Sequence, residues 1–276
     1  AVLELPFDKL VLAGVSAGAG IAMWNGFRES DNDQVEGIVA LYAQSSYDLY
    51  EWQNYFADFD LDSIRSQDSE IQDQADKMVG SDSAGLVYMW GSTGIAYNED
   101  MIAERLGDDA PIDSWSLILD PENASKLEDC GIAILDAPTD VLPNVMTYLG
   151  YSGTSINEAH FEAAGDALSA IRPYLRYVNS SQSINDIANG DICAAIMWSG
   201  DAFQAAYRAE DAENGHVIDY YIPDEGTNLW FDVMAIPADA KNIENAYKFV
   251  DYMMRADVAA ENVNYVWYAS GNKAAM

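Results

Sequence analysis

Apolar and polar positions alternate in blocks along the C-terminal two-thirds of the chain, and these blocks predict strands and helices in turn. Strands are predicted at residues 86–90, 94–97, 131–135, 176–178, 192–198, 217–222 and 229–236. Helices are predicted at residues 98–106, 140–149, 157–175, 183–188, 201–214, 242–254 and 257–266. Strands separated by helices favour an α/β fold with largely parallel sheets.

The N-terminal segment has a different pattern. A strand is predicted at residues 9–13, followed by the glycine-rich stretch 14–18, a helix start, and another strand at 38–43. Strand, G-x-S-x-G and helix form the context of a nucleophile elbow, which would expose Ser16. This segment resembles the elbow of α/β-hydrolase esterases. A catalytic triad also needs a histidine base, and only His160 and His216 are present. A serine esterase is therefore an alternative function, with Ser16 in a structural turn as the other interpretation.

The chain is strongly acidic, with 46 acidic and 13 basic residues among 276 and a net charge of -33. Such a surface repels nucleic acid and anionic lipid, so neither is expected as a partner. It attracts cations, which makes a cationic small ligand plausible, although the charge also serves solubility. No apolar run reaches the roughly 20 residues that a membrane helix needs, so no membrane insertion is expected.

The two cysteines, Cys130 and Cys193, stand at the starts of apolar, β-branched runs. A pair of cysteines is consistent with one disulfide in an oxidising compartment, and equally with two buried free thiols. No metal-ligand cluster or cofactor motif occurs, so neither a metal nor a cofactor is expected.

Several acids lie close to aromatic residues at predicted strand ends. A site for an alkyl diammonium needs carboxylates to replace the water of each ammonium, and aromatic faces along the methylene spacer. Trp198 and Asp201 follow a buried strand, and Trp230 and Asp232 share one face of a later strand. Asp140 follows a third strand. Each residue alone also fits an ordinary core or helix-start role, so the joint pattern carries the prediction.

Nine short segments between residues 86 and 276 form a distinctive series: YMWGSTGIAYN (88–98), APIDSW (110–115), LDAPTDV (135–141), SSQ (180–182), IND (184–186), ANGDIC (188–193), WSGD (198–201), FDV (231–233), and YAS to KAA (268–275). This series resembles the putrescine/spermidine-binding family of bacterial periplasmic proteins, which are the capture subunits of ABC importers. The resemblance covers about residues 86–276.

The resemblance implies a two-lobe, type II periplasmic-binding-protein fold with an atypical or incomplete N-terminal lobe. Lobe one would comprise residues 1–92 and 224–276, and lobe two residues 93–223, with the ligand between them. The family implies a disulfide between Cys130 and Cys193, a periplasmic location, a monomer, and ABC permease subunits as partners. It implies no covalent chemistry, so no enzyme is expected.

The family's ligand residues fall on a defined set of positions in this chain. Trp198, Asp201 and one of Thr139 and Asp140 would bind from one lobe, although the family usually has Glu at the last position. Trp230, Asp232 and Tyr268 would bind from the other side, and Ser46 and Tyr47 align with a Ser-rich binding turn. A putrescine-like diamine is the expected ligand. Tryptophan at 230 is the spermidine-type choice, so a triamine stays open.

The N-terminal strand anchor of the family, a Trp-Ser-Asp-Tyr-like segment, is not found in this sequence. Helices that normally follow the C-terminal segment are also not found. Both departures concern the predicted lobe one.

Overall fold

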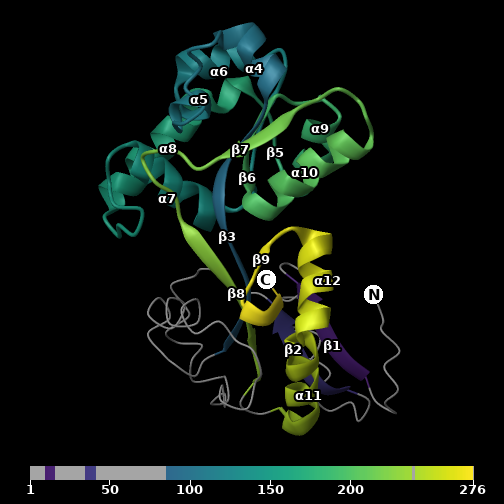
Figure 1. Cartoon of the computed structure of the whole chain (residues 1–276). Coiled ribbons are helices and arrows are strands. Elements are labelled where there is room, and N and C mark those ends of the chain that lie inside the picture. The colour runs from purple at the N-terminus through teal and green to yellow at the C-terminus, as the bar shows by residue number, and fades with distance from the viewer. Residues whose placement is uncertain (1–9, 16–34, 42–84, 238–239, 276) are drawn as a thin grey trace. The chain divides into compact units, whose positions relative to one another are not determined.

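The computed structural model describes residues 10–15, 35–41, 85–237 and 240–275, with only the backbone described for the first two segments (Figure 1). The chain divides into two compact units. Unit 1 comprises Ala1–Trp90, Trp230–Tyr265 and Ala269–Met276, and unit 2 comprises Gly91–Leu229 and Val266–Tyr268. The long strand β3 (Leu86–Asn98) contributes to both units.

The sheet of unit 2 has its strands in the order β3-β6-β4-β5, with β7 also paired to β3. β4 runs parallel to β5 and β6, whereas β3 runs antiparallel to β6 and β7. The bounds are β4 (Ile132–Ile134), β5 (Leu175–Val178), β6 (Ala194–Trp198) and β7 (Ile218–Tyr221).

Helices cover both faces of this sheet, because successive side chains of a strand point to opposite faces. On β3, Ile95 and Tyr97 join one core with Trp115, whereas Ala96 joins a second core with Ala205. The first core packs under α4 (Glu99–Leu106), α5 (Ser116–Leu119), α6 (Pro121–Leu127), α7 (Pro138–Tyr148) and α8 (Glu158–Ile171). The second packs under α9 (Ser183–Ala188) and α10 (Ser199–Asp211) (Figure 1).

Unit 1 contains a second sheet. β1 (Leu10–Val15) is parallel to β2 (Val35–Leu41), β2 is antiparallel to β8 (Leu229–Ala235), and β8 neighbours β3. The short β9 (Ala269–Ser270) pairs with Met89 and Trp90. The core of this unit joins Leu86 and Met234 to Val250 of α11 (Ile243–Met253). The remaining elements are α12 (Ala256–Val266) and the 3-10 turns Arg172–Tyr174 and Lys273–Ala275.

The structure confirms the α/β class and corrects several details. The sheets are mixed and not largely parallel, because β3 pairs antiparallel with its neighbours. The two strands predicted at 86–90 and 94–97 form one continuous strand. The helix predicted to end at residue 175 ends at Ile171, since Pro173 cannot donate a helical hydrogen bond. Helices α5 and α6 were not predicted.

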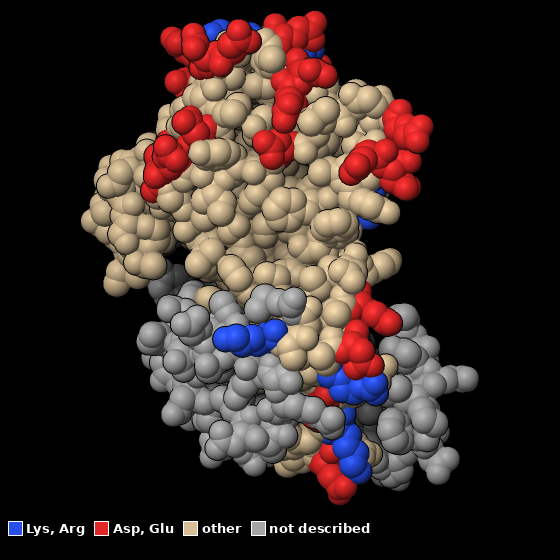
Figure 2. All heavy atoms as spheres, viewed as in Figure 1, with Lys and Arg blue, Asp and Glu red and all other residues tan. Residues whose placement is uncertain are grey.

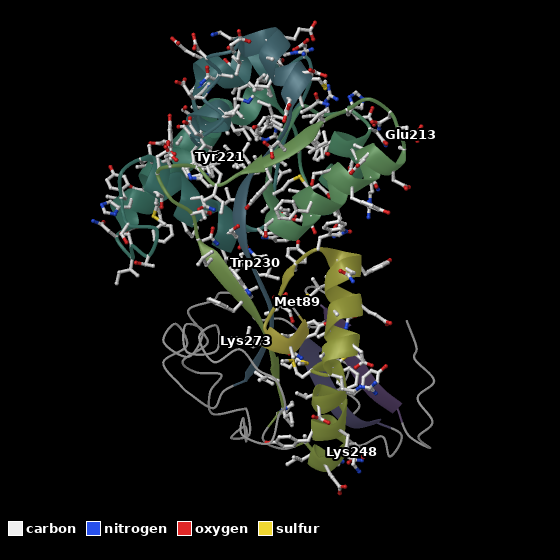
Figure 3. All side chains as sticks on the ribbon, in the orientation of Figure 1. Met89, Glu213, Tyr221, Trp230, Lys248 and Lys273 are labelled. Atoms are coloured by element: carbon white, nitrogen blue, oxygen red, sulfur yellow. A yellow bond between two sulfur atoms is a disulfide. The ribbon has the colours of Figure 1, made fainter. Side chains whose placement is uncertain are left out.

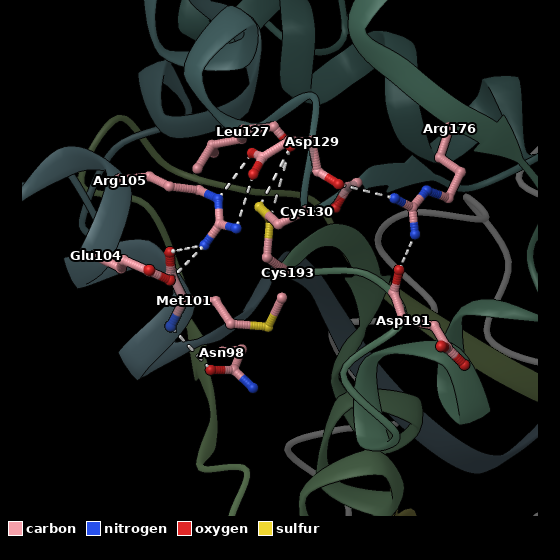
Figure 4. Close-up of a disulfide and its surroundings, with 11 residues drawn as sticks. Asn98, Met101, Glu104, Arg105, Leu127, Asp129, Cys130, Arg176, Asp191 and Cys193 are labelled. Atoms are coloured by element: carbon pink, nitrogen blue, oxygen red, sulfur yellow. Dashed lines mark hydrogen bonds and ion pairs between the residues drawn. A yellow bond between two sulfur atoms is a disulfide. The ribbon is translucent and has the colours of Figure 1, made fainter.

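A disulfide joins Cys130 and Cys193, whose Cα atoms lie 5.5 Å apart (Figure 4). It connects the turn after α6 to the start of β6, and both cysteines are buried. Beside it, Arg105 makes a two-pronged ion pair with Asp129, at 2.8 and 2.9 Å. The bridge closes a loop of 63 residues, which stabilises the fold by about 4 kcal/mol in the chain-entropy model. The bridge implied by the family resemblance is thereby confirmed.

In the part of the chain that the structure describes, no helix is long and apolar enough to cross a membrane. Acidic side chains gather over the surface of α4 and α6, at one end of unit 2 (Figure 2). This surface charge is well hydrated and is distinct from the buried carboxylates described next.

Candidate functional site

Asp201 lies where a buried strand turns into a helix. β6 is buried over Ala194–Met197, and α10 begins two residues before Asp201, which therefore sits in the first helical turn. The partial positive charge of a helix N-terminus favours a carboxylate at this place. The side chain is nevertheless removed from water, because only 9% of Asp201 is exposed.

Tyr268 is the hydrogen-bond partner of this carboxylate. Its hydroxyl donates to Oδ1 of Asp201 over 2.5 Å. The tyrosine ring lies flat against the backbone at Gly200, where an added Cβ would come within 2.5 Å of the ring atom Cδ1. A side chain at position 200 would therefore displace the ring, so the glycine allows the close approach of Tyr268 to Asp201.

Asp140 is the second buried carboxylate of unit 2. It lies in the first turn of α7, two residues after Pro138, and is 6% exposed. Asn228 donates to its Oδ1 over 3.3 Å, and the hydroxyl of Thr139 lies 3.5 Å from its Oδ2. Of the two positions that the sequence left open, Asp140 is buried and Thr139 is half-buried.

Burial controls the charge of both carboxylates. It raises the pKa of Asp201 to about 6, against the hydrogen bond from Tyr268 and the charge of Arg208, which lower it. Burial also raises the pKa of Asp140, whereas hydrogen bonds from Trp198, Asn228 and Thr139 lower it. Within the described residues, neither carboxylate forms an ion pair with Lys or Arg. Two buried carboxylates that lack an ion-pair partner in the described part of the chain suit a cationic ligand.

Trp198 lies close to Asp201 along the chain and contacts Asp140 through its side chain. It ends β6, three residues before Asp201, and its side chain forms a hydrogen bond that acts on the pKa of Asp140. The indole is half-buried and packs against the first core of unit 2. Within unit 2, Tyr268 therefore contacts Asp201, whereas Thr139 and Trp198 contact Asp140.

Trp230 and Asp232 belong to unit 1. They lie two residues apart on β8, so their side chains point to the same face of the strand, and both are half-buried (Figure 3 labels Trp230). Burial, together with the negative charge of Asp232, raises the pKa of Tyr88 on the neighbouring strand β3 to about 12.

The segment that carries Tyr268 is assigned to unit 2, whereas Trp230 and Asp232 are assigned to unit 1. Residues Val266–Tyr268 belong to unit 2, and the Tyr268 hydroxyl binds Asp201. The short return of the chain between α12 and β9 has no periodicity that could reveal this placement from the sequence.

Three residues singled out from the sequence, Ser16, Ser46 and Tyr47, lie outside the described residues. Each of the two histidines forms a hydrogen bond to a polar side chain. Nδ1 of His160 lies 2.7 Å from the Ser155 hydroxyl, and Nδ1 of His216 lies 3.1 Å from the side-chain nitrogen of Asn98.

Sequence reasoning missed three polar residues near Asp140, namely Asn144, Thr227 and Asn228. Asn144 is fully buried on α7, one helical turn after Asp140, which is the only signal in the sequence that could have revealed it. Thr227 and Asn228 precede β8 in a segment without a distinctive pattern.

Two α/β units between which the chain passes repeatedly are typical of two-lobe ligand-binding proteins. The family described as bacterial extracellular solute-binding protein matches residues 23–276. The chain belongs to this family. The match begins at residue 23, well before residue 86, where the resemblance in the sequence starts. Ser16 lies outside the matched residues.

The curated relatives of this chain are polyamine-binding proteins. The putrescine-binding periplasmic protein PotF of Escherichia coli K12 is 50% identical over 191 residues, which are 69% of this chain and 52% of that protein. The putrescine-binding periplasmic protein SpuD of Pseudomonas aeruginosa UCBPP-PA14 is 47% identical over 190 residues, which are 69% of this chain and 52% of that protein. The chain thus spans about half the length of these two relatives.

Solved structures show the same fold. The spermidine/putrescine ABC transporter substrate-binding protein PotD of Streptococcus pneumoniae superposes with a TM-score of 0.67 at 24% identity, covering 91% of this chain and 72% of that one. The Tp0655 lipoprotein of Treponema pallidum gives 0.70 at 18%, covering 97% and 88%. These comparisons confirm the predicted type II binding-protein fold and the extracytoplasmic family, and they do not support the esterase alternative.

Proposed function

We propose that this chain captures a polyamine, with a putrescine-like diamine as the preferred ligand, for an ABC importer. The observation that carries the proposal is the pair of buried carboxylates, Asp140 and Asp201, which have no basic partner among the described residues. An ammonium group that enters this site replaces lost water with a full opposite charge.

Different residues of unit 2 would bind different parts of the ligand. Asp201 would accept an ammonium, with Tyr268 holding the carboxylate in place through its hydroxyl. The indole face of Trp198 would cover the methylene spacer and attract the cation through its quadrupole. Asp140, with Thr139 beside it, would provide a second negative charge.

The remaining predicted ligand residues stay part of the proposal. Trp230 and Asp232 would contribute a second aromatic face and a third carboxylate from unit 1. Ser46 and Tyr47 would contribute hydroxyl groups.

The choice of a diamine draws on the relatives. PotF and SpuD are named for putrescine, whereas a relative from Salmonella typhimurium at 32% identity is named for spermidine and putrescine together. Trp230 is the residue expected of a spermidine site, so a triamine is the second ligand to test.

The wider role follows from the family. We infer that the chain works outside the cytoplasm as a monomer, delivers its ligand to ABC permease subunits and performs no covalent chemistry. The buried disulfide suits an oxidising compartment. Unit 2 would correspond to lobe two, predicted at residues 93–223, and unit 1 to lobe one, predicted at residues 1–92 and 224–276; the units differ from these bounds in placing residues 91–92, 224–229 and 266–268 in unit 2.

A panel of thermal unfolding curves tests the proposal. Putrescine and spermidine should raise the melting temperature in a saturable manner, whereas the monoamine butylamine should not. Asp201→Asn should abolish the shift. Asp211→Asn, the same change at an exposed site of the same helix α10, should preserve it. Equal shifts with butylamine and putrescine, or an unchanged response of Asp201→Asn, would contradict a diamine site.

A further inference from the structure

Asn144 forms a complete set of hydrogen bonds inside unit 2. Its Nδ2 donates to the backbone oxygen of Asp140 over 2.9 Å and to Oδ1 of Asn228 over 2.6 Å. Its Oδ1 accepts from the backbone N–H of Asn228 over 3.1 Å, and the Thr227 hydroxyl oxygen lies at the same distance from it. The residue is fully buried, and a buried amide of this kind is stable because every donor and acceptor is paired.

The chemistry of these partners determines how both amides face. A backbone oxygen can only accept and a backbone N–H can only donate, so Nδ2 of Asn144 must face Asp140, and its Oδ1 must face the N–H of Asn228. The same Nδ2 also faces the side-chain oxygen of Asn228. The side-chain nitrogen of Asn228 is thereby turned toward Oδ1 of Asp140.

The backbone around Asn228 is fixed as well. Its carbonyl accepts from the N–H of Thr93 over 3.4 Å, and the hydroxyl of Thr227 donates to the carbonyl of Thr93. The segment that carries the donor is therefore attached both to β3 and to α7.

We propose that Asn144 and Asn228 are positioning residues, which deliver an amide N–H to Asp140 and keep this buried carboxylate ionised and oriented for an ammonium group. The inference rests on the proposed polyamine site. We call the hydrogen bonds from Asn144 to Asn228 and from Asn228 to Asp140 the relay. Neither asparagine would contact the ammonium group of the ligand: Asn144 acts through Asn228, and Asn228 acts through Asp140.

The relay matters because burial works against a charged Asp140. Burial raises its pKa, and the hydrogen bond from Asn228 is one of the contacts that lower it. The groups facing the carboxylate from α7, from the end of β6 and from the segment before β8 are Thr139, Trp198 and Asn228, and none of them carries a charge. Neutral donors are thus the means by which this site stabilises its anion.

The test compares Asn228→Leu and Asn144→Leu with the unaltered chain. Leucine has nearly the shape of asparagine and lacks its donors. Thr147→Val is the matched control. It removes one part-buried hydrogen bond within α7, from the Thr147 hydroxyl to the Pro143 carbonyl, and leaves the contacts of Asp140 unchanged.

The first readout needs no ligand. Carbon-13 spectra of aspartate-labelled protein, with Asp140→Asn to identify the signal, follow the ionisation of Asp140 against pH. The midpoint should move upward in Asn228→Leu and, in the same direction, in Asn144→Leu. It should stay in place in Thr147→Val. An unchanged midpoint in Asn228→Leu overturns the inference, and that variant keeps the test decisive if Asn144→Leu fails to fold.

The second readout is putrescine affinity, measured above and below the Asp140 midpoint that the carboxyl titration gives. Because Asp140 of Asn228→Leu would lose its charge at a higher pH than Asp140 of the unaltered chain, the pH at which the affinity falls should move upward together with that midpoint. If the unaltered chain does not bind putrescine, the proposed function fails, while the carboxyl titration still decides the role of the relay. If it binds and the variant shows the same pH dependence, the relay fails and the function stands.

Discussion

Replacing Asp201 with asparagine should stabilise the ligand-free protein while it destroys ligand binding. The carboxylate is 9% exposed and lacks a basic ion-pair partner among the described residues. In the ligand-free state, the buried charge of Asp201 therefore lowers the free energy of unfolding. Asparagine has nearly the same shape, and its side-chain oxygen can still accept the hydrogen bond from Tyr268.

The magnitude follows from the pKa. The pKa of Asp201 rises from its ordinary value of 3.8 to about 6 on folding. The folded state thus binds the proton more tightly than the unfolded state, so the stability that Asp201 contributes is present in full below pH 3.8 and is lost as the pH rises through about 6. A difference of 2.2 pH units, 6 minus 3.8, corresponds to about 3 kcal/mol. Asparagine avoids this loss.

The assay is urea unfolding of both proteins at about pH 7.5, 6 and 4, since comparing the two at each pH cancels the acidic background. The variant should be more stable by about 1 to 3 kcal/mol at the highest pH, and the advantage should fall to about 0.5 kcal/mol or less at the lowest. Its affinity for putrescine should fall by about a hundredfold or more, because a buried ammonium would lose its counter-charge. A variant that is less stable at every pH, or an advantage that does not depend on pH, would refute the reasoning.

Three further perturbations have defined outcomes. Gly200→Ala should lower both the melting temperature and the putrescine affinity, the latter by about tenfold, because the new methyl group displaces the Tyr268 ring; unchanged affinity would show that the ring position is irrelevant. Replacing Cys130 and Cys193 together with serine should lower the free energy of unfolding by about 2 to 5 kcal/mol in urea titrations, whereas a smaller change would mean that the bridge adds little. Asp232→Asn should shift the ultraviolet titration of one tyrosine to lower pH, since the Asp232 charge raises the pKa of Tyr88; an identical titration curve would contradict their proximity.

Much of unit 2 could be predicted from the sequence because its signals are local. Buried runs such as Ala194–Trp198 identify strands, and Asp201 and Asp140 mark helix starts. The same signals placed Trp198 and Asp201 in one site, because a strand end and the following helix start must lie close together.

The rest depends on contacts that a local pattern does not record. β3 continues through Gly91–Thr93, where small and polar residues favour a break, because the strand is paired on both sides of this segment with strands from distant parts of the chain. The Tyr268–Asp201 bond joins residues 67 positions apart, and the Asn144–Asn228 bond joins residues 84 positions apart. Family resemblance could indicate the ligand residues, but not the amides that support Asp140.

A calorimetric titration of the chain with putrescine, in about 150 mM salt so that surface charges are screened, tests the central claim most directly. The account predicts saturable one-to-one binding with a dissociation constant at or below about 1 μM, equivalent to about −8 kcal/mol, and little change when the salt is doubled. Weak, unsaturable heat that disappears with added salt would contradict it, because the acidic surface alone would then explain the attraction of cations.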